Sequence, residues 1–385
     1  MLAALIGIAP VSAEPPRLRP EVTAAHVLSR TLNEAVHSVP ITVMPFEGSA
    51  AETEFTLTTF RPAGPGPFPV VVFSHGRGPD NAYPSRFRFS VVADYFVRRG
   101  FAVLVPTRVG YGGLGNAIDP EVGQLRCDVA AAERQVDSVR RHVVAALQWA
   151  GRQSWADPKR VIIAGGSVGG YTSVALAPML SSPPIAVINF AGGSGGNPKR
   201  RPGAPCNPDR IANVLAKAGK GSAAPTLWIY AENDRYWGAK YPRDWHQAYV
   251  RAGGRAEFHM LGPVGDDGHD VIGGGFSLWR PIADRFLSGL GHPAPKVENA
   301  PQPTNFAALD AIETVPVNAK GKSSEGYPRF LNADVPRAFV VAPNGGWAYV
   351  SGRASALQDA LARCQELTNS TCKPYAVDDA VVWRK

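Results

Sequence analysis

The chain has 385 residues and a formal net charge of +8, with 45% hydrophobic and 19% charged residues. This composition excludes wholesale disorder, which requires few apolar residues and an excess of one charge. The sequence contains no stretch of about 18 uncharged apolar residues, as a membrane helix needs, and no recognition motif for nucleic acid. The only basic run, Lys199-Arg200-Arg201, lies between Pro198 and Pro202, and we expect it to form a solvated surface loop.

The N-terminal segment has the character of a signal peptide. Residues 1–13 are apolar and uncharged, and they end in Val11-Ser12-Ala13, a small-residue pattern typical of signal cleavage. The basic residue that usually begins a signal peptide is missing and the apolar stretch is short, so a frayed N-terminus or a misplaced start is the alternative. With a signal peptide the protein would be periplasmic or secreted.

The four cysteines are an even number, which fits an oxidising compartment. Cys364 and Cys372 are eight positions apart, which suggests a local disulfide from the end of a helix to the start of a strand. Cys127 and Cys206 would then pair by elimination, although other pairings and free buried thiols are also compatible with the sequence. No metal-ligand spacing of the zinc type occurs, so neither a metal site nor a cofactor is expected.

The first half of the chain predicts a series of strands. Residues 41–44 and 54–60 indicate an initial antiparallel pair. The continuous apolar run at 70–73 is typical of a parallel strand buried on both faces. Further strands are expected at 101–105, 161–164, 185–190, 226–230 and 257–261.

Helical patterns separate these strands. They cover residues 87–99 and 127–149, and others begin near Gly169, Arg243 and Trp279. Strands that alternate with helices at this spacing predict the α/β class, a mostly parallel sheet with helices on both faces, within one domain over residues 41–290.

The C-terminal part of the chain differs in character. Residues 291–327 are rich in proline and polar residues, which indicates a linker or a wrapping segment. Beyond it, residues 337–350 predict a hairpin, 354–367 a helix and 375–383 a strand. We therefore expect a small ββαβ module of the α+β class at residues 328–385.

Two segments match the Gly-x-Ser-x-Gly pattern of a nucleophile elbow, at Gly165–Gly169 and at Gly192–Gly196. An elbow needs a strand before the serine and a helix after it, because this sharp turn exposes the hydroxyl. A strand precedes Ser167 and a helix-forming segment follows it, whereas Ser194 is followed by a proline-containing loop. We therefore expect Ser167 to be the nucleophile.

A serine nucleophile needs a histidine base and an acid, which this class of fold supplies in the order Ser, acid, His. Asp234 follows the strand at 226–230, and His269 lies in a glycine-rich loop after the strand at 257–261. Glu232 is an alternative acid, but the shorter Asp234 suits rigid orientation of an imidazole. The other nearby carboxylates, Asp266, Asp267 and Asp270, are expected to cap or shape the histidine loop.

Two backbone amides should stabilise the oxyanion. We expect Val168, directly after the nucleophile, and Arg77, in the loop after the first buried strand, to provide them. His75 is then a structural residue of that loop. The glycines at 110–115 spell a dinucleotide motif but lead into no helix, so we expect Arg108 and Tyr111 to line the substrate pocket instead.

The segments Phe73–Gly78, Gly165–Gly170, Ala231–Asp234 and Gly268-His269 together resemble the α/β-hydrolase superfamily. Within it, residues 41–290 are similar to the dienelactone hydrolase-like branch that includes platelet-activating-factor acetylhydrolase-like enzymes. True dienelactone hydrolases use a cysteine nucleophile, whereas this chain has Ser167. The C-terminal module weakly resembles accessory modules of exported bacterial proteins, which implies no known chemistry.

The expected function is a serine carboxylic ester hydrolase with a small-molecule ester substrate and an acyl-enzyme intermediate. A serine peptidase of the same fold is an alternative, although a propeller-sized N-terminal domain is missing from the sequence. A non-catalytic envelope binding protein on a hydrolase scaffold is a further alternative.

Overall fold

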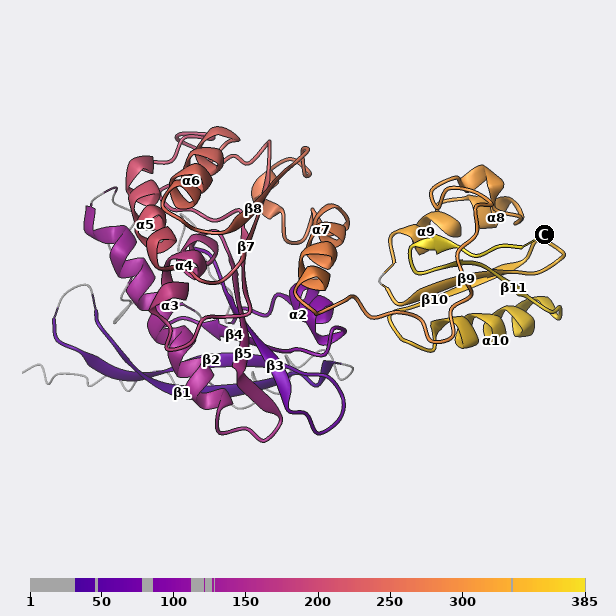
Figure 1. Cartoon of the computed structure of the whole chain (residues 1–385), viewed down its shortest axis with the longest axis horizontal. Coiled ribbons are helices and arrows are strands. Elements are labelled where there is room, and N and C mark those ends of the chain that lie inside the picture. The colour runs from indigo at the N-terminus through magenta and orange to yellow at the C-terminus, as the bar shows by residue number, and fades with distance from the viewer. Residues whose placement is uncertain are drawn as a thin grey trace, which may run out of the picture. The chain divides into compact units, whose positions relative to one another are not determined.

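The computed structural model describes residues 32–45, 48–77, 86–111, 121, 127, 129–333 and 335–384 (Figure 1). The expected signal peptide at residues 1–13 lies outside this range. The chain divides into two units, one made of residues up to Ala93 together with Ala102–Ile272, and the other of Asp94–Phe101 together with Gly273–Lys385. No helix in the described ranges is long and apolar enough to cross a membrane.

An eight-stranded sheet forms the centre of the first unit, in the order β1-β2-β4-β3-β5-β6-β7-β8. The initial strands β1 and β2 pair antiparallel, as expected, and β2 also runs antiparallel to β4. All later neighbours pair in parallel. The strands are β1 (Ala35–Val43), β2 (Ala51–Phe60), β3 (Phe68–Ser74), β4 (Ala102–Thr107), β5 (Ala156–Gly166), β6 (Ala186–Phe190), β7 (Thr226–Ala231) and β8 (Ala256–Leu261).

The helices between residues 90 and 289 follow the predicted pattern with one addition. They are α2 (Ser90–Val97), α3 (Val129–Ala150), α4 (Val168–Leu176), α5 (Pro208–Gly221), α6 (Lys240–Arg251) and α7 (Phe276–Gly289). Helices α3 to α6 pack side by side in chain order (Figure 1). Every residue of α4 is buried, because this helix lies between the sheet and its neighbours α3 and α5. The fold is the predicted mostly parallel α/β sheet.

Helix α5 had not been predicted. It buries Ile211, Leu215 and Ala218 on one stripe and starts with Pro208, a residue favoured in the first turn of a helix. These two signals were present in the sequence.

The second unit contains a separate antiparallel sheet in the order β10-β9-β11-β12. Its elements are β9 (Arg337–Val341), β10 (Trp347–Ser351), α10 (Ala356–Thr368), β11 (Lys373–Val377) and the short β12 (Ala380–Val381), which extends the predicted ββαβ order. Alternate residues of β9 face opposite ways. Ala338 and Val340 pack with α10, whereas Phe339 and Val341 join an aromatic cluster with Tyr327 and Tyr375.

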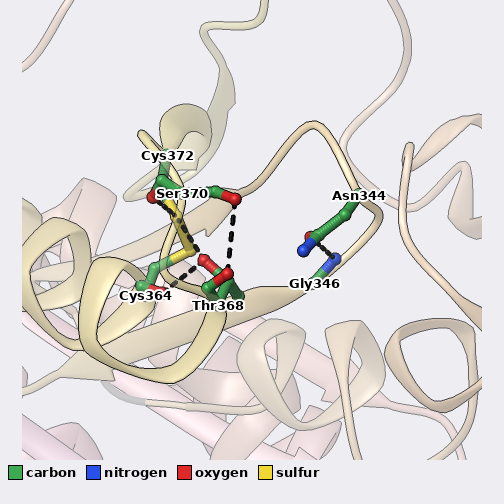
Figure 2. The surroundings of a disulfide bond; sticks show 6 residues. All are labelled: Asn344, Gly346, Cys364, Thr368, Ser370 and Cys372. Carbon is green, nitrogen blue, oxygen red and sulfur yellow. Dashed lines mark hydrogen bonds between the residues drawn. A yellow bond between two sulfur atoms is a disulfide. The ribbon is translucent and has the colours of Figure 1, made fainter.

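The predicted Cys364–Cys372 disulfide is present and joins the end of α10 to the start of β11 (Figure 2). The hydroxyl of Thr368 donates to the carbonyl oxygen of Cys364 (2.7 Å), which closes the last turn of α10 at the disulfide. Asn344 accepts a hydrogen bond from the Gly346 amide in the β9–β10 turn, within the predicted hairpin (3.0 Å). The helix-to-strand connection of the module is therefore covalently closed.

The proline-rich segment wraps the small module. Val297 and Val315 are buried in the two clusters on opposite faces of its sheet. The Thr304 amide donates to the carbonyl oxygen of Val381 (2.8 Å), and the hydroxyls of Thr314 and Tyr375 are hydrogen-bonded (2.7 Å). The short helices η5 (Ile312–Thr314), α8 (Ala319–Lys322) and α9 (Tyr327–Leu331) belong to the same layer. The core of the module is thus larger than one built from residues 328–385 alone.

Candidate active site

Ser167 occupies the turn between β5 and α4. Its backbone angles are φ 54° and ψ −123°, a positive-φ conformation that serine rarely adopts and that a strained nucleophile elbow requires. A side chain at Gly165 would overlap the backbone of Gly169, and one at Gly169 would overlap the Ser74 carbonyl group. The turn closes only because no side chain occupies either position.

The loop after β3 lies directly against this turn. A Cβ atom added to Gly76 would be 2.8 Å from the Cβ atom of Ser167. Arg77, the next residue, lines the same pocket as Ser167 and Val168. The two residues expected to supply oxyanion amides therefore line the same pocket as the serine.

Asp234 and His269 are in contact. Nδ1 of His269, in the turn η4 (Gly268–Asp270), is 3.0 Å from Oδ2 of Asp234, whose side chain is completely buried. Oδ1 of Asp234 accepts from the amides of Tyr236 (2.7 Å) and Trp237 (3.1 Å). Both carboxylate oxygens are thus engaged, which fixes the direction in which Asp234 can orient the imidazole.

Asp267 has the role expected of the other carboxylates. It accepts hydrogen bonds from the amides of His269 and Arg235 (both 3.0 Å) and so caps the loop. None of the hydrogen bonds described for Glu232, Asp266 or Asp270 reaches His269.

The loop that carries His269 reaches the elbow. A Cβ atom on Gly166, next to Ser167, would be 2.6 Å from Cδ1 of Ile272. Tyr236 stacks on the imidazole of His269 with ring centroids 3.9 Å apart. Within the described part of the chain, no hydrogen bond joins the Ser167 hydroxyl to His269, a bond that often tightens only when substrate binds.

A pocket of about 390 Å³ opens at Ser167. Its wall contains Tyr236, Trp237 and the loop from Ser194 to Arg201. The basic run Lys199–Arg201 is exposed, as a surface loop should be, but it also lines the pocket, which sequence reasoning missed. Ser194, the rejected nucleophile, lies in the same wall and not on a strand-to-helix turn.

The second predicted disulfide, Cys127–Cys206, fixes this loop. The Cys206 amide donates to the Gly195 carbonyl group (2.9 Å), and the Asn207 side chain donates to the Cys127 carbonyl group (3.2 Å). One end of the pocket wall is therefore anchored to the segment that precedes α3.

Arg108 and Tyr111 do not line the pocket, contrary to the sequence-based expectation. Each side chain is 1% exposed. Arg108 Nε donates to Glu121 (2.6 Å) and its Nη1 to the His75 carbonyl group (2.7 Å), while the Tyr111 hydroxyl donates to Glu121 (2.7 Å). Arg77 Nη1 donates to the Tyr111 hydroxyl oxygen (3.0 Å). These residues hold the Arg77 loop in place and are not available to substrate.

Glu121 is the centre of this network, and its importance could not be read from the sequence. Burial alone would raise the pKa of its carboxyl group, but the charges and hydrogen bonds of Arg108 and the charge of Arg77 outweigh burial and hold the pKa well below its usual range. Glu121 is therefore a buried carboxylate that needs its arginine partners.

Two buried histidines support the same region. Nδ1 of His75 donates to the Gly76 carbonyl group (2.7 Å), and its Nε2 accepts from the Arg108 amide (3.1 Å). Nδ1 of His142 donates to the Ser138 carbonyl group (2.7 Å), and its Nε2 accepts from the Val109 amide (3.0 Å). Both imidazoles must be neutral, because a protonated Nε2 cannot accept, so the structural role predicted for His75 is confirmed.

Acid should destabilise the protein through these histidines. Burial lowers the pKa of His142 to about 4 and that of His75 well below its usual value. Between pH 6.5 and pH 4 the unfolded chain binds more protons than the folded one, so stability falls as the pH is lowered. His142 alone should remove about 3 kcal/mol between pH 7 and pH 4. Urea unfolding at several pH values measures this loss, which His142→Gln should reduce; an unchanged pH dependence in the variant would contradict the assignment.

A known protein family matches the part of the chain that contains Ser167. Residues 87–183 match the sequence model of the prolyl oligopeptidase family. Among curated proteins, none matches the sequence. The family match agrees with the predicted α/β-hydrolase fold, since it covers α2 to α4 with Ser167 between β5 and α4.

Solved structures of hydrolases are similar to this chain at low identity. An acylaminoacyl peptidase of Pyrococcus horikoshii is 15% identical, with a TM-score of 0.48, over 69% of this chain and 43% of its own. An acetyl xylan esterase of a Paenibacillus species is 18% identical (TM-score 0.45; 67% and 89% covered). A predicted dienelactone hydrolase of Klebsiella pneumoniae is 14% identical (TM-score 0.42; 67% and 99%). The chain spans less than half the length of the acylaminoacyl peptidase.

Proposed function

We propose that this chain, a serine hydrolase with the α/β-hydrolase fold, cleaves carboxylic esters through Ser167, His269 and Asp234. The observation that carries the proposal is the strained conformation of Ser167 in the wall of a pocket, with His269, in contact with Asp234, on a loop that packs against the same turn. A serine on a surface turn with no such neighbours would have no means of activation.

The proposed reaction follows from these positions. The Nδ1–H group of His269 donates to Asp234, which leaves Nε2 as the acceptor for the proton of Ser167. The serine oxygen then attacks the ester carbonyl carbon, and the amides of Arg77 and Val168 stabilise the negative oxygen. His269 returns the proton to the leaving alcohol. Water, activated by the same imidazole, hydrolyses the acyl-enzyme and restores Ser167.

Peptide hydrolysis is the second candidate, and the match of residues 87–183 to the prolyl oligopeptidase family favours it. Both activities use the same nucleophile, so the leaving group must separate them. Turnover of 4-nitrophenyl butyrate compared with that of aminoacyl 4-nitroanilides is the direct measurement. Esterase function predicts turnover of the ester with no measurable turnover of the anilides, and the reverse preference would assign a peptidase.

A non-catalytic role is tested by covalent labelling. A fluorophosphonate probe reacts only with an activated serine. We expect labelling of the intact protein at Ser167, located by peptide mass spectrometry. An unlabelled but folded protein would instead support a scaffold that binds without chemistry.

The C-terminal module should be dispensable for turnover of a small ester. Every proposed catalytic residue lies in the first unit, and the segment from Val297 onward packs on the sheet of the module. A chain that ends at Pro293 should keep its kcat/KM for 4-nitrophenyl butyrate within about twofold, as expected for sites without shared contacts. Loss of turnover in a shortened protein that remains folded by circular dichroism would show that the module contributes to the pocket.

The two disulfides are consistent with a secreted or periplasmic location, since such bonds persist in oxidising compartments. Export itself stays a prediction.

A further inference from the structure

The pocket at Ser167 has a cationic wall. Among the described residues that line it are Arg77, Lys199, Arg200 and Arg201, and none of the described lining residues is an aspartate or a glutamate. The guanidinium of Arg77 is engaged with Glu121 and Tyr111, behind the oxyanion loop. The exposed positive charge of the pocket wall therefore comes from the loop of residues 194–201.

Hydrogen bonds and a disulfide fix the conformation of this loop. The side chain of Asn197 accepts from the amides of Lys199 (3.2 Å) and Arg200 (2.9 Å), and the Arg201 amide donates to the Asn197 carbonyl group (2.9 Å). The Cys127–Cys206 disulfide then closes the end of the loop. Preorganisation of this kind lowers the entropy cost of binding.

Arg200 and Arg201 differ in their partners from the half-buried arginines of α3. Arg140 and Arg141 on α3, both half-buried, form ion pairs with Asp137 three and four positions away on the same helix. Arg201 donates through Nη2 to the carbonyl group of Gly195 (3.3 Å), which positions its guanidinium without neutralising it. Among the described residues, no acidic side chain pairs with Arg200 or Arg201.

We propose that Arg200 and Arg201 bind a carboxylate of the substrate, so that the preferred esters are those that carry a negative charge near the cleaved bond. Arginine suits this role because its planar guanidinium matches a carboxylate with two parallel hydrogen bonds. The proposal rests on the proposed function, since it assigns the substrate class of the same site. It also accounts for a basic run that neither catalysis nor folding requires.

The test compares two esters that differ in one charge. Mono-4-nitrophenyl glutarate carries a free carboxylate at neutral pH, and its methyl ester is the neutral counterpart. We expect kcat/KM to be about tenfold higher for the charged ester, the effect of one charge-assisted contact. The preference should shrink as NaCl is raised, because salt screens an exposed site. Turnover of the neutral ester reports the proposed function separately.

Variants of the loop test whether Arg200 and Arg201 cause the preference for the charged ester. Arg200→Gln with Arg201→Gln should remove it, so that the ratio of kcat/KM for the charged ester to that for the neutral ester falls to about one. The matched control, Lys217→Gln with Lys220→Gln, removes the same charge from the exposed face of α5, outside the pocket, and should keep the preference. Arg200→Lys with Arg201→Lys should retain part of it, since the charge stays but the paired hydrogen bonds are lost.

The outcomes are distinguishable. Equal turnover of both esters by the unaltered protein, or a preference that survives the arginine double variant, would overturn the proposal while the hydrolase function stands. If neither ester is hydrolysed and Ser167 is not labelled by the fluorophosphonate probe, the proposed function fails and this inference fails with it.

Discussion

Replacing Ser167 by alanine is expected to abolish ester hydrolysis, with a loss in kcat of about a million-fold, the cost of removing the nucleophile of a catalytic triad. Alanine lacks the oxygen that forms the acyl-enzyme. It keeps the same Cβ atom at the same positive φ, so the strain of the turn and the melting temperature should change little. The initial rate on 4-nitrophenyl butyrate and a thermal melt of both proteins give the comparison.

Ser194→Ala is the matched control for this prediction. Ser194 lies in a second Gly-x-Ser-x-Gly segment and lines the same pocket, but it does not follow a strand into a helix. Its loss should change kcat/KM only slightly. If Ser194→Ala were inactive and Ser167→Ala active, the elbow would be assigned to the wrong segment.

Glu121→Gln should cost about 3 to 5 kcal/mol of stability, the penalty for leaving a buried charge without its partner. The substitution would leave the Arg108 guanidinium, 1% exposed, without the carboxylate that now bonds its Nε and Nη2. Urea unfolding at pH 7 measures the change. Because the pKa of Glu121 is lowered in the folded state, this contribution is fully present at neutral pH and is lost progressively as the pH falls below the ordinary pKa of 4.5.

Activity should also fall in the Glu121→Gln protein, since the carboxylate holds Arg77 and Tyr111 beside the loop that supplies one oxyanion amide. Glu52→Gln is the control, because Glu52 is an exposed glutamate on β2. It should change stability by less than about 0.5 kcal/mol. Equal stability of the Glu121 and Glu52 variants would mean that the buried network contributes nothing.

The elbow and the central strands could be predicted because their signals are local. Four apolar residues at 161–164, a glycine-flanked serine and an alanine-rich segment lie next to one another in the sequence, and the structure joins them as β5, Ser167 and α4. Asp234 is preferred over Glu232 because its shorter side chain suits rigid orientation of an imidazole. The contact of Asp234 with His269 is consistent with that choice.

The pocket wall could not be predicted in the same way. Lys199–Arg201 reads as an ordinary solvated loop, and only the fold brings it to the mouth of the Ser167 pocket. Arg108 and Tyr111 were placed in that pocket because they flank glycines, whereas the fold pairs them with Glu121. The contact partners that determine these positions, Ser167 for the basic loop and Glu121 for Arg108 and Tyr111, are brought close only by folding. The periodicity of a single sequence contains no information about such contacts.

The Cys127–Cys206 disulfide also separates the proposed nucleophile from the other two residues of the triad along the chain. Its partners are 79 positions apart, and the covalent ring that they close contains Ser167, whereas Asp234 and His269 lie outside the ring. Ring closure restricts the unfolded chain by about 4.5 kcal/mol on the loop-entropy relation, against about 2.5 kcal/mol for the short Cys364–Cys372 loop. When a thiol reductant breaks both disulfides, the unfolded segment between residues 127 and 206, which contains Ser167, would therefore gain more conformational freedom than the loop between residues 364 and 372.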